Sequence, residues 1–76
     1  MINIDNKLME DNMADESCKS PSNGDLWEIY EDAKGDWRWR RTSPNGNIVG
    51  SSSEGYRNKS ECKDNARRHG MDCEPE

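Results

Sequence analysis

The stretch "GDWRWRRT", residues 35–42, carries two tryptophans and three arginines in eight positions and decides the fold. Successive side chains of a β-strand point to opposite faces, so Trp37 and Trp39 lie on one side and Arg38 and Arg40 on the other. Burying one large aromatic side chain contributes about 2–3 kcal/mol. The stretch therefore predicts a strand with one apolar, buried face and one basic face.

Two further strands are predicted on either side of this one. Residues 26–31, "LWEIYE", alternate apolar and polar side chains, and "DAKGD" after them has the composition of a turn. The Asn45-Gly46 pair, which tolerates positive φ, predicts a tight hairpin before a strand over residues 47–53. The expected result is a three-stranded antiparallel meander, with strands at about 26–31, 37–42 and 47–53. Its buried face is expected to combine the tryptophans with Trp27, Ile29 and one of Ile48 or Val49.

A helix is predicted over residues 59–69, after the meander. Asn58 is a suitable N-cap residue, and Glu61 three positions later completes a capping box. Gly70 suits the left-handed conformation that ends many helices. The helix face expected to meet the sheet is small, and consists of Cys62, Ala66 and His69. Residues 71–74 could add one brief strand, which gives an α+β fold of three strands, one helix and a short C-terminal strand.

The composition limits what this chain can bury. Of its 76 residues, 29% are hydrophobic, 36% are charged and none is phenylalanine. Such a chain leaves part of itself disordered or takes core from a partner. Residues 1–24 are polar and acidic, so we expect them to form a disordered N-terminal tail before a single domain over residues 25–76.

Net charge and cysteine usage bear on location and partners. The net charge of −5 argues against a general nucleic-acid coat protein. No segment is apolar enough for a signal peptide or a membrane span. The three cysteines are odd in number and include no Cys-x-x-Cys pair. These features predict a reduced, cytoplasmic protein with no membrane partner, in which Cys62 is a small buried residue and Cys73 a thiol of the tail.

No motif predicts an enzyme, a cofactor or a metal. The segment "GSSSEG", residues 50–55, is similar to a nucleophile elbow, but Glu54 stands where the elbow requires glycine. Cys62, His69, Asp72 and Cys73 have ligand-type side chains without the paired spacing of a zinc site. No glycine-rich phosphate loop is present. We therefore expect a protein that is not an enzyme and that has no cofactor.

The central part of the sequence resembles the YegP-like domain, a small uncharacterised module of bacteria and archaea. The resemblance covers about residues 26–69 and rests on "WEIY" (27–30), "GDWRWR" (35–40), "NGNI" (45–48), and "SSSEGY" (51–56) followed by Lys59. Proteins of this family contain either tandem repeats or single copies that pair into one continuous sheet and exchange their C-terminal strands. The resemblance therefore implies that this single-copy chain forms a homodimer. The family brings no established activity.

The arginines are the remaining candidates for a binding site. Arg38, Arg40 and Arg41 are expected on the sheet face that the helix leaves open. The alternatives for this face are a solvated surface that pairs with Glu28 and Glu31, a site for a protein or peptide, and a nucleic-acid site. Nucleic acid is less favoured, because the tryptophans that could stack on bases lie on the buried face. The sequence thus predicts a homodimeric, non-enzymatic binding module of unknown ligand. Its candidate ligand-binding residues are Arg38, Arg40, Arg41, Arg67 and Arg68.

Overall fold

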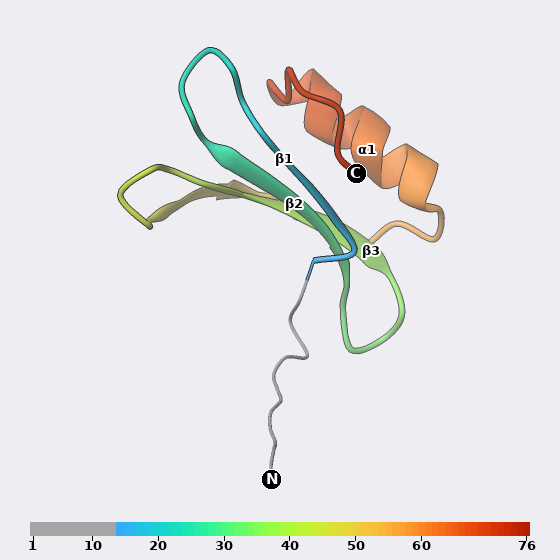
Figure 1. The fold of residues 1–76 in the computed structure, drawn as a ribbon. Coiled ribbons are helices and arrows are strands. Elements are labelled where there is room, and N and C mark those ends of the chain that lie inside the picture. The colour runs from blue at the N-terminus through green and yellow to red at the C-terminus, as the bar shows by residue number, and fades with distance from the viewer. Residues whose placement is uncertain (1–13) are drawn as a thin grey trace, which may run out of the picture.

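The computed structural model describes residues 14–76 as one antiparallel sheet with a single helix packed on one side (Figure 1). The sheet has four strands in the order β1-β2-β3-β4, so each strand pairs with its neighbours in the sequence. Their bounds are β1 Glu16–Lys19, β2 Leu26–Glu31, β3 Trp37–Thr42 and β4 Ile48–Ser51, and the helix α1 spans Lys59–Arg68.

The prediction of a three-stranded meander with a short C-terminal strand is wrong. A fourth strand, β1, precedes the meander, and residues 71–76 form no strand. The sequence of β1, "ESCK", lacks the aromatic and β-branched residues that mark strands, so its conformation depends on pairing with β2. The predicted tail over residues 1–24 therefore includes an element of the sheet. Its first thirteen residues lie outside the described part of the chain, where the prediction of disorder stays a prediction.

The turn between β2 and β3 is organised by one carboxylate. Oδ1 of Asp32 accepts hydrogen bonds from the backbone N–H groups of Lys34 (2.9 Å) and Asp36 (3.0 Å). Gly35 has a φ of +86°, a conformation that favours glycine. This local network brings Trp37 opposite Glu31 and fixes the register of the two strands.

The predicted alternation in β2 and β3 is confirmed, and it builds the core. Trp27, Ile29 and Trp39 are 1%, 0% and 3% exposed on the face that α1 covers. The rings of Trp27 and Trp39 lie 5.2 Å apart, while Trp37 is half-buried at the margin. The core is small, as the composition implied, and consists of Trp27, Ile29, Trp39, Cys62, Ala66 and Met71.

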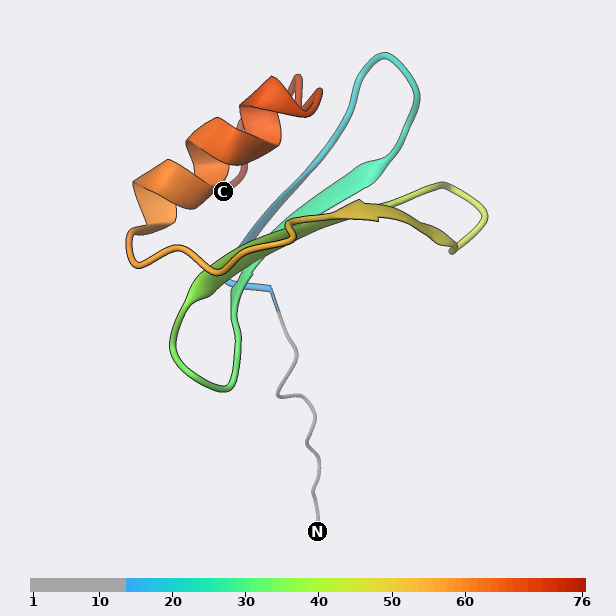
Figure 2. The same cartoon turned by 180° about the vertical axis from the view of Figure 1, so that it is seen from behind.

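The expectation that Ile48 or Val49 joins this core is wrong. Ile48 is 62% exposed and Val49 is 54% exposed. The register of β4 shifts between Arg41 and Thr42, as at a β-bulge. Helix α1 packs mainly against β2 and β3. The chain then continues past β4 along β3, where Tyr56 pairs with Trp37, before it turns into the helix (Figure 2).

Helix α1 begins and ends close to the predicted bounds, but its caps differ in part. Asn58 is the N-cap residue, yet its side chain makes no capping hydrogen bond, so the predicted capping box is not formed. At the other end, the N–H of His69 donates to the carbonyl of Ala66 (3.0 Å), and Gly70 follows with a φ of +113°. Cys62 and Ala66 are buried as expected, whereas His69 is exposed and only its ring contacts Trp39.

The C-terminal segment returns to β1, which sequence reasoning did not foresee. A disulfide joins Cys18 of β1 to Cys73, 55 residues later, so the prediction of a reduced protein with Cys73 as a tail thiol is wrong. Met71 and Pro75 are buried. Beyond them, Ser17 and Glu76 exchange two backbone hydrogen bonds of 3.1 Å each. Residues 71–76 thus lie against the sheet of their own chain. They form no C-terminal strand that could be exchanged with a partner.

Candidate functional site

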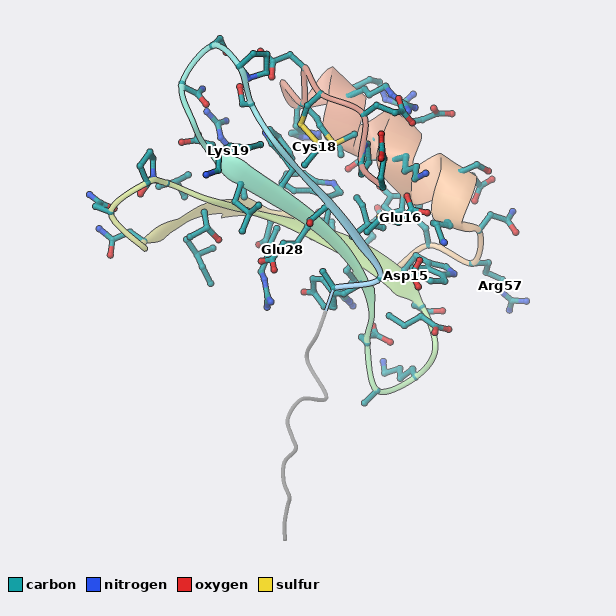
Figure 3. The ribbon with its side chains drawn as sticks, in the orientation of Figure 1. Asp15, Glu16, Cys18, Lys19, Glu28 and Arg57 are labelled. Carbon is teal, nitrogen blue, oxygen red and sulfur yellow. A yellow bond between two sulfur atoms is a disulfide. The ribbon has the colours of Figure 1, made fainter. Side chains whose placement is uncertain are left out.

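Arg38 and Arg40 lie on the sheet face opposite α1, as predicted. In the register of β2 and β3, Arg38 stands opposite Tyr30, and Arg40 stands opposite Glu28. Directly opposed residues share a face. Figure 3 shows Glu28 pointing away from the helix, while Glu16 and Cys18 lie on the helix side. The open face is therefore a row of charged and aromatic side chains.

Both arginines on this face are engaged by carboxylates of the same subunit. Nε of Arg38 donates to Oδ2 of Asp32 at 2.7 Å, and Nε of Arg40 donates to Oε1 of Glu28 at 2.8 Å. The guanidinium of Arg40 also lies over the ring of Tyr30, 5.0 Å from its centre. The hydrogen bond from Arg38 lowers the pKa of Asp32, and the same bond raises the pKa of Arg38. The pair of Arg40 with Glu28 matches the cross-paired surface that the sequence left open as one alternative. The other expected acid, Glu31, stands opposite Trp37, and Asp32 pairs with Arg38 instead.

Arg41 does not lie on the open face, so this part of the prediction is wrong. It stands directly opposite Trp27, on the face that carries α1. Its guanidinium lies 5.3 Å from the centre of the Trp27 ring, and its Nε donates to Oδ2 of Asp25 at 2.6 Å. The two-residue period of a strand places Arg41 with Trp37 and Trp39 rather than with Arg38.

The two helix arginines lie apart from the sheet arginines. Arg67 is exposed and pairs with Asp64 (3.0 Å) and Glu74 (3.1 Å). Arg68 is exposed and makes no ion pair with another residue of the described chain. The five predicted residues therefore occupy three places: the open face, the helix-side face next to Trp27, and the C-terminal end of α1. The structure does not bring them together into one site.

A cluster of opposite charges at the start of α1 was missed. Oε1 of Glu16 lies 2.5 Å from Nζ of Lys63, and Oε2 lies 3.1 Å from Nζ of Lys59, which also pairs with Asp15. The ammonium of Lys59 lies 4.9 Å from the centre of the Trp37 ring. The hydrogen bonds from Lys63 and Lys59 lower the pKa of Glu16, and those to Asp15 and Glu16 raise the pKa of Lys59. The four-residue spacing of the lysines is the sequence signal for this cluster, because the sequence "ESCK" of β1 does not itself indicate a strand.

The residues weighed for catalysis have structural partners. Ser52 is buried, and its hydroxyl accepts the backbone N–H of Trp39 at 3.2 Å. A Cβ on Gly55 would lie 2.6 Å from the Cβ of Asp36, so the glycine permits a close approach of two segments. Nδ1 of His69 lies 2.9 Å from the backbone carbonyl of Asn65. The glycines and serines of this segment thus support the path of the chain from β4 into α1.

The potential metal ligands are dispersed in the same way. Within residues 14–76, no three His, Cys, Asp or Glu side chains are grouped so that they could hold a metal ion. Cys73 is bonded to Cys18, and Cys62 is fully buried with its pKa raised to about 11 by desolvation. Asp72 accepts a 2.7 Å hydrogen bond from the hydroxyl of Ser22. As for membranes, α1 is the only helix in the part of the chain described, and its ten residues are neither long nor apolar enough to cross a bilayer.

These features define a small α+β domain, in which one antiparallel sheet is covered on a single side by one helix. Residues 32–68 match the family model described as "Domain of unknown function (DUF1508)". DUF1508 is the YegP-like family, so the predicted resemblance is confirmed over residues 32–68. The function of this family is unknown, and no enzymatic activity is assigned to it.

Two curated relatives from Neisseria meningitidis match part of the chain. They are UPF0339 protein NMB1088 of serogroup B and UPF0339 protein NMA1193/NMA1859 of serogroup A / serotype 4A, each 46% identical over 37 residues. The matched part is 49% of this chain and 64% of each relative, so the chain covers less than two thirds of their length. No solved structure matches the chain significantly.

Proposed function

We propose that this domain is a non-enzymatic interaction module that acts as a homodimer, with β4 as its contact strand. The observation that carries the proposal is the exposed edge of the sheet at β4, where Ile48 and Val49 are 62% and 54% exposed. An edge strand with apolar side chains is a template for pairing with another strand. The other edge differs, because Glu76 pairs with Ser17 along the outer side of β1.

The size of the core also favours a partner. Six residues form the core of the described domain, and two of them, Cys62 and Ala66, are small. Pairing two β4 strands would continue the sheet across a two-fold axis and cover four apolar side chains. The resemblance to the YegP-like family implies the same arrangement, in which two units share one sheet. Exchange of C-terminal strands plays no part in this dimer, because residues 71–76 form no strand.

The test is the dependence of stability and mass on protein concentration. Dimerisation stabilises by mass action, so the melting temperature should rise with concentration over a hundredfold range. Val49→Lys adds a charge to the β4 edge and should shift sedimentation toward the monomer. Ala33→Lys adds the same charge to an exposed turn and is the control. A folded monomer at all concentrations, with a constant melting temperature, would contradict the dimer.

The arginines favour a protein partner over nucleic acid. The guanidinium groups of Arg38, Arg40 and Arg41 each donate to a carboxylate of their own subunit, which reduces the positive charge that phosphate could meet. Their role as ligand-binding residues, with Arg67 and Arg68, stays a prediction. Binding of mixed-sequence DNA or RNA at about 50 mM salt, weakening as salt rises, would restore the nucleic-acid alternative.

A further inference from the structure

The three cysteines of the chain differ in their access to solvent. Cys62 is 0% exposed, and burial raises its pKa to about 11, so its thiol is shielded and resists forming a thiolate. Cys18 and Cys73 are each half-buried and joined by a disulfide. Thiol–disulfide exchange therefore has one target in this domain, the bond between β1 and the C-terminal segment.

The contacts on the two sides of Cys73 are unequal. Before it, Met71 is buried in the core and Asp72 accepts a hydrogen bond from Ser22. After it, Glu74 pairs with Arg67 at the exposed surface, Pro75 is buried, and Glu76 exchanges backbone hydrogen bonds with Ser17. Exposed ion pairs contribute little. The disulfide is the covalent attachment of this segment to β1, beside one buried side chain and two backbone hydrogen bonds.

We propose that the Cys18–Cys73 disulfide is a redox latch, whose reduction frees residues 74–76 from β1 and uncovers the outer edge of that strand. The reductant is a dithiol. One of its thiolates attacks a sulfur of the disulfide, the bond between the cysteines breaks, and a mixed disulfide forms. The second thiol then displaces the remaining cysteine, so that two electrons and two protons pass to Cys18 and Cys73 while the dithiol becomes a disulfide.

The rest of the fold does not depend on this bond. Strand β1 still pairs with β2 through the register from Glu16–Ile29 to Lys19–Leu26, and Glu16 still binds Lys63. The buried cluster around Trp39 includes neither Cys18 nor Cys73, which only pack against it. Reduction consequently changes one edge: the N–H and C=O of Ser17 lose Glu76 and become free to pair with an added strand. Together with β4, this gives the reduced sheet two open edges.

Amide hydrogen exchange of the whole chain, oxidised and then reduced with dithiothreitol, tests the latch. The amides of Ser17 and Glu76 should lose protection by about tenfold or more on reduction, while those of Trp39 and Ala66 keep theirs. Cys73→Ser should reproduce the reduced pattern without reductant. Cys62→Ala, which leaves the disulfide in place, should still respond to reduction at Ser17 and Glu76.

Two results would overturn the proposal. If Ser17 and Glu76 stay protected after reduction, the disulfide does not hold the edge closed. If all amides lose protection together, in the reduced chain or in Cys73→Ser, the bond supports the whole fold and is not a local latch. Neither result bears on the β4 dimer, which is judged from the oxidised protein by its mass.

Discussion

The indole N–H of Trp39 donates a 2.8 Å hydrogen bond to Oδ1 of Asn65, and so joins the central strand β3 to helix α1. Trp39 is 3% exposed, so its polar N–H group is withdrawn from water and needs a hydrogen-bond partner within the protein. This bond orients the ring against Trp27 and His69, whose rings lie 5.2 and 5.3 Å away. It is one of the polar contacts that fix the helix over the sheet, beside the ion pairs of Glu16 with Lys59 and Lys63.

Asn65→Ala should therefore destabilise the domain by about 1–3 kcal/mol, because a buried donor loses its acceptor. Asn58→Ala is the matched control at the start of the same helix. The side chain of Asn58 makes no capping hydrogen bond, so its loss should cost about 0.5 kcal/mol or less. Urea unfolding of the oxidised protein measures both. A larger effect at Asn58 than at Asn65 would show that the capping box predicted from the sequence forms after all.

Gly55→Ala should destabilise by about 1–3 kcal/mol through overpacking. Its new Cβ would lie 2.6 Å from the Cβ of Asp36, which neither backbone can accommodate without moving. Gly50→Ala is the control, since its Cβ would meet Trp39 at an ordinary 3.6 Å. Neither glycine has a positive φ, so steric contact is the only difference under test. Equal decreases in the melting temperature of the two variants would mean that the backbone around Gly55 moves to accommodate the new Cβ at little cost.

The parts of the fold that follow from local pattern were predictable. Alternation in "WRWR" separated Trp39 from Arg38 and Arg40, and the same rule, applied one residue further, places Arg41 beside Trp27. Turn residues such as Gly35 and Gly46 marked the hairpins, and both have the positive φ that glycine permits. These features depend on neighbours within a few positions, which is what a single sequence displays.

The missed parts depend on contacts between distant residues. Strand β1 has little intrinsic strand preference and forms through its pairing with β2. A disulfide across 55 residues joins it to the C-terminal segment, and ion pairs from Glu16 join it to the helix. The exposure of Ile48 follows from a register shift in β4, which the composition of that strand does not reveal. In the candidate site, the sequence predicted the carboxylate partner of an arginine only where the two residues lie directly opposite each other on neighbouring strands, as Glu28 and Arg40 do.

Acid should weaken the attachment of β1 to α1. The lysines lower the pKa of Glu16 in the folded protein below the ordinary value of 4.5. Its contribution is therefore present above about pH 4.5 and is lost as the pH falls through the folded value. Glu16→Gln should remove about 0.5–1 kcal/mol of stability at neutral pH and flatten the acid side of the profile.

Glu54→Gln is the control for this pH dependence. Glu54 is exposed and makes no ion pair with another residue in the described part of the chain. Urea midpoints of the three proteins between about pH 3 and pH 7 provide the measurement. If Glu16→Gln keeps the slope of the parent protein, the lysine pairs do not contribute to folding.

Arg41→Ala should lower the free energy of unfolding more than Arg38→Ala or Arg68→Ala. The reason is that its partner, Asp25, is the most buried carboxylate among the ion pairs of the sheet. The Asp25 side chain is 8% exposed, compared with 19% for Asp32, the partner of Arg38. Removing Arg41 leaves a buried charge without its cation and uncovers the Trp27 ring, so we expect a loss of about 1–3 kcal/mol. Arg38→Ala should reduce stability less, since its partner Asp32 is more exposed than Asp25. Arg68→Ala, at an exposed position with no ion pair to a described residue, should change stability by about 0.5 kcal/mol or less. Urea unfolding ranks the three, and equal losses at Arg38 and Arg41 would mean that the ion pair of Asp25 gains nothing from its burial.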